Sequence, residues 1–479
     1  MSEFSELLKL HMKRSNVSMV DIAAYCGTER TTIYKFSNGT RTPSSYATVK
    51  KIADYLRLTH SERRTFIEKY MIAVVGERVY ERRKKARDFI RLFSSSYSHQ
   101  YAPMETQASD IEEPGEQKRI VQGTSCIICA IHQELLREAR SENGVVKVAY
   151  DPLDKALTHV FINVLGTNPS LRFSHVIGIY NESVSELSEG RNLEALSNTI
   201  PLCMANSNYE CFYEYRNYAG RDAFPIFKGV VVTSHAVIMF NEELTSAAIF
   251  HEEEFIRFYQ EQFEIMEKRC TKLFLRNDNM LAHDRSQDTA FLESIQGETI
   301  KYRLQPFMVA MYDEMMLRKC LFRSELEKEN AEWIVSYVKR LRETLAEHRP
   351  LVVMSLDEVR EFMDTGFIGI IPRQAQSKLE MEERLKVLDK LIKVFEKTNV
   401  KVFNKENESN LGDLSMWVTM NSIKMFFKTP QDVFYLSVKE PGLVDTFRDY
   451  LGNIEPWLFY DEKEALSLLR KLRNEYAKK

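Results

Sequence analysis

Four polar side chains within six residues are the first feature of the sequence that could do chemistry. Helical spacing puts Arg30, Thr31, Tyr34 and Lys35 on one side of a short segment and Ile33 on the other. The four side chains are hydrogen-bond donors and two carry positive charge, but they contain no pairing of a nucleophile with a base. They therefore predict recognition of a partner rather than catalysis.

Two predicted helices and the turn between them must position these side chains. Ser18 can begin the first helix, because its side chain can accept a hydrogen bond from a free backbone N–H. Ile22 and Ala23 share the apolar face of that helix, and Gly27 can adopt the left-handed conformation that ends it. A second helix follows over residues 29–37, and the Asn-Gly and Thr-Pro pairs after it predict turns. We interpret the whole segment as a helix-turn-helix.

Residues 4–58 resemble the five-helix DNA-binding domain of the phage Cro and repressor (XRE) family. The matching skeleton consists of small, apolar and turn-forming residues, namely Ile22-Ala23, Gly27, Ile33, Gly39, Arg41 and Pro43. Their spacing supplies what that fold needs: a small residue where two helices cross, a glycine in the turn, and an apolar residue beneath the reading helix. A small helical bundle with a polar surface is the alternative interpretation.

The resemblance implies that the helix at residues 29–37 reads bases in the major groove of DNA. The implied base-reading residues are Arg30, Thr31 and Lys35, with Tyr34 in addition, and the implied phosphate-binding residues are Asn38, Thr40 and Arg41. Two positions depart from the family pattern. Met19 replaces a common glutamine and removes one phosphate contact, and Ser37 replaces an acidic residue and removes local polar support.

Length and composition predict a multidomain protein without a membrane span. A chain of 479 residues has room for two or three domains, and an apolar share of 44% is sufficient for packed cores. No apolar run reaches the roughly 18 residues of a transmembrane helix, and the N-terminal residues lack the apolar core of a signal peptide. Seven scattered cysteines, an odd number, favour a reducing compartment over a disulfide framework. We therefore expect a cytoplasmic protein.

Charge is distributed unevenly along the chain. Residues 1–93 contain 19 Lys and Arg against 10 Asp and Glu, a net charge of +9, while the whole chain carries −3, so the remainder carries −12. A basic head on an acidic body fits a head that meets phosphate. One basic run could follow the DNA backbone or form the solvated face of a connecting helix: Arg82, Arg83, Lys84, Lys85 and Arg87.

We predict an all-α, lambda-repressor-like head joined to a mixed α/β body. The expected segments are a DNA-binding domain (1–60), a basic connecting helix (61–93), a linker (94–122), a first α/β lobe (123–285), a helical connector (286–347) and a second α/β lobe (348–479). In the body, strands are expected at 144–150, 172–180, 210–215, 229–240, 351–355, 400–404, 415–421, 422–427 and 433–438. Helices are expected at 124–140, 255–273, 356–364, 378–398, 441–452 and 463–477.

Residues 231–263 resemble residues 417–451 in the order of their predicted elements. Each segment predicts a strand, a turn, a second strand, a polar hinge, a third strand and an amphipathic helix. The body could therefore consist of two duplicated lobes, with chance similarity as the alternative. The arrangement is weakly similar to the phospholipase-D-like lobes that some prokaryotic regulators use as sensor domains. The catalytic His-x-Lys signature of that family is absent from both segments, so the resemblance implies a lobe that binds and does not cleave.

Cys126, Cys129 and His132 have a spacing that metal sites use. Structural zinc needs four ligands, however, and no second Cys or His pair lies at a matching distance. The segment also predicts an amphipathic helix in which the cysteines pack in the core as small apolar residues. A metal site or a redox switch remains the alternative.

The other candidate residues favour structural roles. His251–Glu254 is expected to begin a helix, where acidic residues are favourable, and His175 and His235 are expected to be buried and hydrogen-bonded in strands. A basic cluster could meet an anionic effector or form a solvated helix face: Arg318, Lys319 and Arg323. Neither a glycine-rich phosphate loop nor a Gly-x-Ser-x-Gly motif is present. We therefore expect no catalytic residue, no metal and no cofactor, and a protein that is not an enzyme.

The sequence as a whole predicts a sequence-specific transcriptional regulator. One such head buries too little surface for tight binding, so we expect a homodimer on a palindromic operator in double-stranded DNA. The body would bind an unknown small-molecule or peptide effector. Two alternatives remain: a DNA-tethered enzyme with a hydrolase-like body, and a peptide-pheromone sensor whose body would be almost wholly helical.

Overall fold

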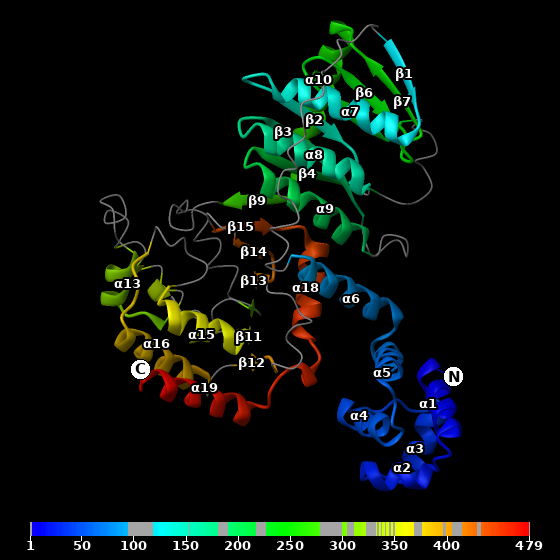
Figure 1. The fold of residues 1–479 in the computed structure, drawn as a ribbon, viewed down its shortest axis with the longest axis vertical. Coiled ribbons are helices and arrows are strands. Elements are labelled where there is room, and N and C mark those ends of the chain that lie inside the picture. Colours follow the sequence, from blue (N-terminus) through cyan, green and yellow to red (C-terminus); the bar gives the residue numbers. More distant parts are fainter. Residues whose placement is uncertain are drawn as a thin grey trace. The chain divides into compact units, whose positions relative to one another are not determined.

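Two compact units, Met1–Lys85 and Ala86–Lys479, make up this multidomain mixed α/β protein. The computed structural model (Figure 1) describes residues 2–93, 118–152, 154–180, 190–216, 227–277, 299–303, 311–321, 350–367, 376–395, 399–404, 414–428 and 433–478, with isolated positions between 332 and 347. No helix formed by these residues is long and apolar enough to cross a membrane. The larger unit contains two β-sheets, unlike the almost wholly helical body of a peptide-pheromone sensor.

The first unit is built from short helices. They are α1 (Glu3–Arg14), α2 (Met19–Cys26), α3 (Arg30–Ser37), α4 (Tyr46–Tyr55) and α5 (His60–Val75). The predicted cap at Ser18 is confirmed, because its side chain accepts from the Asp21 N–H and the Asp21 carboxylate accepts from the Ser18 N–H. Gly27 ends α2 in the left-handed region, at φ 69°, as predicted.

An apolar core holds these helices together and includes α5. Ile22, Ala23 and Ile33 are buried where α2 and α3 meet. Phe66 of α5 lies 4.9 Å from Phe4 of α1, measured between ring centroids. Residues 61–93 were predicted to form a connecting helix, but the apolar residues of α5 belong to the core of the first unit.

Helix α6 (Glu77–Leu92) begins in the first unit and ends in the second. Gly76, at φ 86°, separates α5 from α6. Phe89 of α6 packs edge-to-face on Phe447 at 5.1 Å, and Phe93 packs on Phe427 at 5.9 Å. The end of the basic helix is therefore part of the core of the second unit.

The first sheet of the second unit has the strand order β1-β7-β6-β5-β2-β3-β4-β8. Its strands are β1 (Lys118–Gln122), β2 (Val145–Ala149), β3 (Arg172–Tyr180), β4 (Tyr209–Arg216), β5 (Gly229–Val232), β6 (Val237–Phe240), β7 (Ser246–Phe250) and β8 (Thr271–Lys272). Strands β2, β3 and β4 are parallel, and the others pair antiparallel. Its helices are α7 (Thr124–Ala139), α8 (Lys155–Thr167), α9 (Arg191–Ala205) and α10 (Glu253–Glu267).

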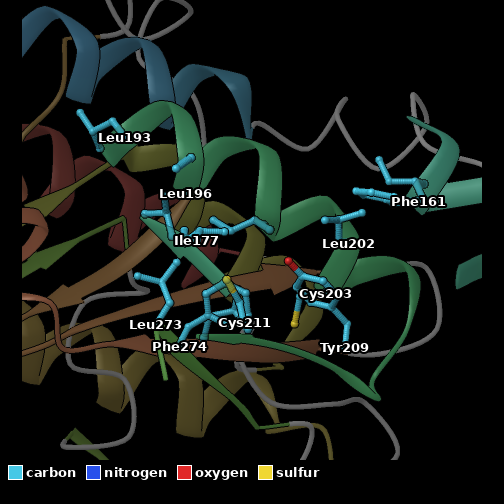
Figure 2. Close-up of a cluster of buried hydrophobic side chains, with 14 of the residues drawn as sticks. Phe161, Ile177, Leu193, Leu196, Leu202, Cys203, Tyr209, Cys211, Leu273 and Phe274 are labelled. Atoms are coloured by element: carbon cyan, nitrogen blue, oxygen red, sulfur yellow. The ribbon is translucent and has the colours of Figure 1, made fainter. Parts of the chain in front are cut away.

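Alternate residues of this sheet pack on different helices. Ile177 of β3 lies in the main core with Leu196 of α9, whereas Val176 packs with Phe263 of α10. Figure 2 shows Ile177, Leu193 and Leu196 in that main core together with Leu273, which lies where the chain leaves the first sheet for the second. The linker prediction was wrong for residues 118–122, which form β1 on the edge of the sheet, and residues 94–117 lie outside the described residues.

The second sheet has the strand order β12-β11-β10-β13-β14-β15-β9. Its strands are β9 (Phe274–Asn277), β10 (Ile300–Tyr302), β11 (Leu351–Met354), β12 (Val400–Val402), β13 (Ser415–Val418), β14 (Ile423–Lys428) and β15 (Val433–Val438). Its helices are α13 (Glu314–Leu321), α15 (Leu356–Thr365), α16 (Met381–Phe395), α18 (Pro441–Gly452) and α19 (Glu462–Tyr476), with a 3-10 turn, η4 (Pro456–Leu458). The prediction of a helical connector over 286–347 was wrong at β10, which is a central strand of this sheet.

The two sheets share one topology. Read from one edge, β1-β7-β6-β5-β2-β3-β4 in the first sheet corresponds to β9-β15-β14-β13-β10-β11-β12 in the second, with the same parallel and antiparallel pairings. The turns at Thr233 and Thr419 also correspond: each threonine hydroxyl accepts a backbone N–H three residues later, at 2.9 and 3.1 Å. The order of elements predicted for residues 231–263 and 417–451 is confirmed.

Candidate nucleic-acid interface

The outer face of α3 carries the side chains that the sequence singled out. Arg30, Thr31 and Lys35 are exposed, and 56% of the Tyr34 side chain is accessible to solvent. On the opposite face Ile33 is fully buried. The eight residues of α3 therefore separate a packing face from a polar face, as the helical spacing predicts.

The loop after α3 folds back onto the end of that helix. Asn38 accepts at Oδ1 from the Thr40 N–H at 3.1 Å and from the Thr40 hydroxyl at 2.7 Å. The Arg41 N–H donates to the Lys35 carbonyl at 3.2 Å. These bonds place Asn38, Thr40 and Arg41 in one ordered turn beside the polar face of α3. The side-chain oxygen of Asn38 is thus hydrogen-bonded within the loop, and the side-chain N–H groups of Asn38 are the donors that it can offer to a partner.

The side chain of Ser37 is hydrogen-bonded within α3. The Ser37 hydroxyl is buried and donates to the Tyr34 carbonyl at 3.0 Å. It thereby satisfies a carbonyl in the last turn of α3 without a charged side chain.

The cations on this face have no acidic partner. Among the residues that the structure describes, Arg30, Lys35 and Arg41 form no ion pair, whereas Arg14 pairs with Glu62 and Arg63 with Asp54 elsewhere in the same unit. Glu29, the residue before α3, is occupied by the Thr31 hydroxyl, which donates to it at 3.0 Å. The face is therefore a concentration of unneutralised positive charge and hydrogen-bond donors.

The basic run of α6 is more engaged with the protein. Lys84 lies 3.2 Å from Glu81 and 3.7 Å from Glu68, and Arg87 lies 3.8 Å from Asp88. Arg82 and Arg83 are half-buried. Part of the charge of this run is thus balanced by neighbouring carboxylates, which reduces what it can offer to an external anion.

The prediction that Cys126 and Cys129 pack in the core was wrong. Both are exposed on α7, whose buried residues include Ile127 and Ile131. Apolar residues follow one another so closely in this segment that periodicity alone selects the wrong face. His132 lies 3.4 Å from Asn163 through Nε2. No group of three His, Cys, Asp or Glu residues in the described parts of the chain could hold a metal ion.

The two strand histidines differ. His175 is fully buried, donating from Nε2 to the Tyr150 carbonyl at 2.8 Å and lying 2.9 Å from the Tyr209 hydroxyl through Nδ1, as predicted. Burial lowers the pKa of His175 to about 4. His235 lies in the turn between β5 and β6 with 35% of its side chain exposed, so the expectation of a buried histidine was wrong there.

The remaining charged candidates behave as structural or solvated groups. Glu253 and Glu254 occupy the first turn of α10, as the sequence predicted for the acidic run. Arg318 pairs with Glu314 at 2.9 Å, and Lys319 pairs with Glu383 at 2.9 Å, both on exposed helix surface. Arg323, the third member of that cluster, lies outside the described residues.

The sequence analysis missed a polar network at the carboxyl ends of β2, β3 and β4. Asp151 accepts from the Gly178 N–H at 2.7 Å, from the Tyr180 hydroxyl at 3.1 Å and from the Arg216 guanidinium at 3.0 Å. A β-carbon at Gly178 would come within 2.6 Å of the Arg216 Nε, so any larger residue there would force the Arg216 side chain to shift. Burial and the charge of Asp151 raise the pKa of Tyr180, which keeps its proton and donates.

A parallel arrangement of the three strands is what brings this network together, and no local sequence signal revealed it. Ligands of open α/β sheets bind outside the carboxyl ends of parallel strands. The strands themselves were predicted, but the crossover helices α8 and α9 were not. Without those helices, the sequence analysis had no reason to expect parallel pairing.

Comparisons with known proteins identify no family for this chain. No protein-family model matches it, and no curated protein matches it. Among solved structures it is similar to TrmBL2, an archaeal chromatin protein described as having a novel mode of DNA binding, with 14% identity, a TM-score of 0.23, and coverage of 56% of this chain and 98% of that one. It is also similar to phosphatidylserine synthase of Haemophilus influenzae Rd KW20, with 12% identity and a TM-score of 0.21. That similarity covers 76% of this chain and 94% of the synthase. Neither similarity is close enough to establish a shared fold.

Proposed function

We propose that this protein is a sequence-specific, DNA-binding transcriptional regulator whose reading element is α3. The observation that carries the proposal is the polar face of α3, where the cations of Arg30, Lys35 and Arg41 have no acidic partner within the described residues. A duplex offers phosphate charge and base-edge acceptors to such a face. The resemblance of residues 4–58 to the Cro and repressor family supports the same assignment.

In the proposed complex α3 enters the major groove. Arg30 and Lys35 donate to guanine acceptors, and the Thr31 and Tyr34 side chains contact neighbouring base edges. The ordered turn that contains Asn38, Thr40 and Arg41 donates to phosphates and sets the register of the helix on the duplex. The apolar residues beneath α3 hold it rigidly, so its polar face needs little rearrangement on binding.

We propose further that the protein acts as a homodimer on a palindromic operator. A single reading module buries about 600–1,000 Å² of protein surface, which is less than specific operator binding usually requires. Two symmetry-related heads would double that area and impose a fixed spacing between half-sites. The second unit would supply the dimer contact and set that spacing.

The second unit is proposed to bind an effector rather than to catalyse a reaction. Asp151, Tyr180 and Arg216 form a preorganised polar group at the strand ends of the first sheet, where α/β sheets bind ligands. A small molecule with both donors and acceptors would suit this mixture of carboxylate, hydroxyl and guanidinium. The shared topology of the two sheets supports an origin by duplication, with one lobe retained for this role.

Selection of bound sites from a random double-stranded DNA library tests the proposal. Full-length protein at stated salt should enrich a palindromic motif, and the half-site spacing would report the geometry of the dimer. In the same selection, the Arg30→Ala variant should show a weaker base preference at one position in each half-site. Retention of DNA without any enriched motif, abolished by moderate salt, would overturn sequence-specific recognition by α3.

A further inference from the structure

Two exposed cysteines lie within the first two turns of α7. Cys126 and Cys129 are the exposed residues among the seven cysteines, all of which lie in described parts of the chain. The buried cysteines are Cys203, Cys211 and Cys320, and the half-buried ones are Cys26 and Cys270. Since reactivity follows thiolate character and access to solvent, the pair on α7 is where a soluble oxidant would meet thiols first.

Helix geometry brings these two thiols almost within bonding range. Residues three apart in an α-helix have α-carbons about 5 Å apart, inside the roughly 4.4–6.8 Å that disulfides span. Their β-carbons are about 5–6 Å apart, whereas a disulfide needs roughly 4 Å. Joining Cys126 to Cys129 therefore requires the first turn of α7 to move by an ångström or two, but no larger rearrangement.

The first turn of α7 is built so that it can open at little cost. Its N-cap is Gly123, at φ 88°, which provides no side chain to accept a free backbone N–H, and the turn contains no acidic residue. By contrast, Asp154 caps the neighbouring α8 and accepts from the Leu157 N–H at 2.8 Å. The first buried residue of α7 is Ile127, so opening the preceding residues uncovers little apolar surface.

We propose that Cys126 and Cys129 form a reversible dithiol–disulfide modification site whose oxidant is a hydroperoxide. The sulfur of one thiolate attacks a peroxide oxygen, the O–O bond breaks, and a sulfenic acid forms together with an alcohol, which is water when the oxidant is hydrogen peroxide. The second sulfur attacks the first and displaces its hydroxyl as water, which closes the S–S bond. Two thiols and one hydrogen peroxide thus give one disulfide and two waters, and a thiol reductant reverses the change.

Oxidation at this position acts on the edge of the first sheet. Gly123 directly follows β1, and its N–H donates to the Thr245 carbonyl at 2.9 Å. Among the described strands, β1 lies at one edge of the first sheet and pairs with β7. Opening the turn after Gly123 loosens this bond and with it the end of β1. The proposed oxidation does not depend on DNA recognition by α3, so the failure of one proposal would leave the other unaffected.

Differential alkylation of the full-length protein tests the site, with hydrogen peroxide as the probe. After oxidation and tryptic digestion, the peptide Ile120–Arg137 contains both cysteines. It should resist alkylation and lose about 2 Da, the mass of two hydrogen atoms, and dithiothreitol should restore both alkylatable thiols. Hydrogen exchange should accelerate in the oxidised protein at the amides of Gly123 and Ile127, whose bonds to the Thr245 and Gly123 carbonyls the intact turn maintains.

Cys126→Ser and Cys129→Ser are the matched variants, and Cys270→Ser is the control. Each variant of the pair should abolish the product that lacks 2 Da and leave one thiol that oxidises to a sulfenic acid, whereas C270S should behave as wild type. The proposal is overturned if both thiols of the wild-type peptide stay alkylatable after peroxide treatment. It is equally overturned if they oxidise separately to sulfinic acids, or if they form only intermolecular disulfides.

Discussion

Replacing Lys35 by alanine separates base recognition from folding. The Lys35 side chain is exposed and forms no ion pair with any described residue. Its backbone carbonyl accepts from the Arg41 N–H at 3.2 Å and from the Thr40 hydroxyl at 3.4 Å, and alanine preserves that carbonyl. The substitution therefore removes a proposed DNA contact while the loop that orders the neighbouring residues stays in place.

The expected magnitudes differ strongly between stability and binding. Loss of an exposed, unpaired side chain changes the free energy of unfolding by less than about 0.5 kcal/mol. Loss of a contact to a base edge costs about 1–3 kcal/mol of binding free energy, which is roughly a 5- to 150-fold rise in Kd. Lys35→Ala should therefore weaken binding to the selected operator by at least about fivefold in a protein of unchanged stability.

Fluorescence anisotropy with the selected operator, at several salt concentrations, measures the loss of affinity. Lys13→Ala is the matched control, because Lys13 is an exposed lysine on α1 and its replacement removes the same charge. Both variants should lower general affinity slightly, but only Lys35→Ala should relax the preference at one base position. If both variants select the wild-type motif and bind it with equal affinity, Lys35 does not read a base.

Three further predictions concern α6 and the second unit. Arg82→Ala combined with Arg83→Ala should weaken binding to every DNA sequence and flatten the dependence of log K on log salt, because fewer counterions are released. Phe89→Ala should lower the free energy of unfolding of the second unit by about 3–5 kcal/mol in urea denaturation, because the ring is 3% exposed and packs on Phe447. His175→Gln should remove a pH dependence of stability. Burial lowers the pKa of His175 from 6.5 to about 4, so its contribution is complete above pH 6.5 and is lost as pH falls toward 4. The loss amounts to roughly 3 kcal/mol.

Each of these predictions has an outcome that contradicts it. An unchanged salt slope in the double arginine variant would mean that the basic run is a solvated helix face, and Arg318→Ala, far along the chain on α13, serves as the control. A shift in the unfolding of the first unit by Phe89→Ala would show that the end of α6 packs there instead. Equal pH profiles for wild type and His175→Gln between pH 4 and 6.5 would show that His175 is not held neutral by burial.

Features that depend on a few neighbouring residues could be predicted from the sequence. Ser18 caps α2 and Gly27 ends it because a cap and a left-handed glycine act on adjacent backbone groups. Ile33 is buried and Lys35 exposed because a short helix with one apolar face has only one way to pack. The polar face of α3 follows from that local pattern, so the candidate interface was visible before the structure.

Features that depend on pairing between distant segments could not be predicted. The orientation of α7 is decided by the sheet it covers, and its closely spaced apolar residues allowed the cysteines to be assigned to the wrong face. Strand β10 has three residues, which are too few to show an alternation of apolar and polar side chains. Its pairing with β11 and β13 is what makes it a strand.

The sequence by itself indicated the local structure of the first unit: the caps and turns around α2 and α3, and the side chains that α3 presents to solvent. Tertiary structure alone decided how the strands of the second unit pair. Parallel pairing of β2, β3 and β4 brought Asp151, Tyr180 and Arg216 together, although Asp151 and Arg216 are 65 residues apart in the sequence. Side-chain direction within a helix is a local property, whereas the order of strands in a sheet is set by contacts that form only when the whole chain has folded.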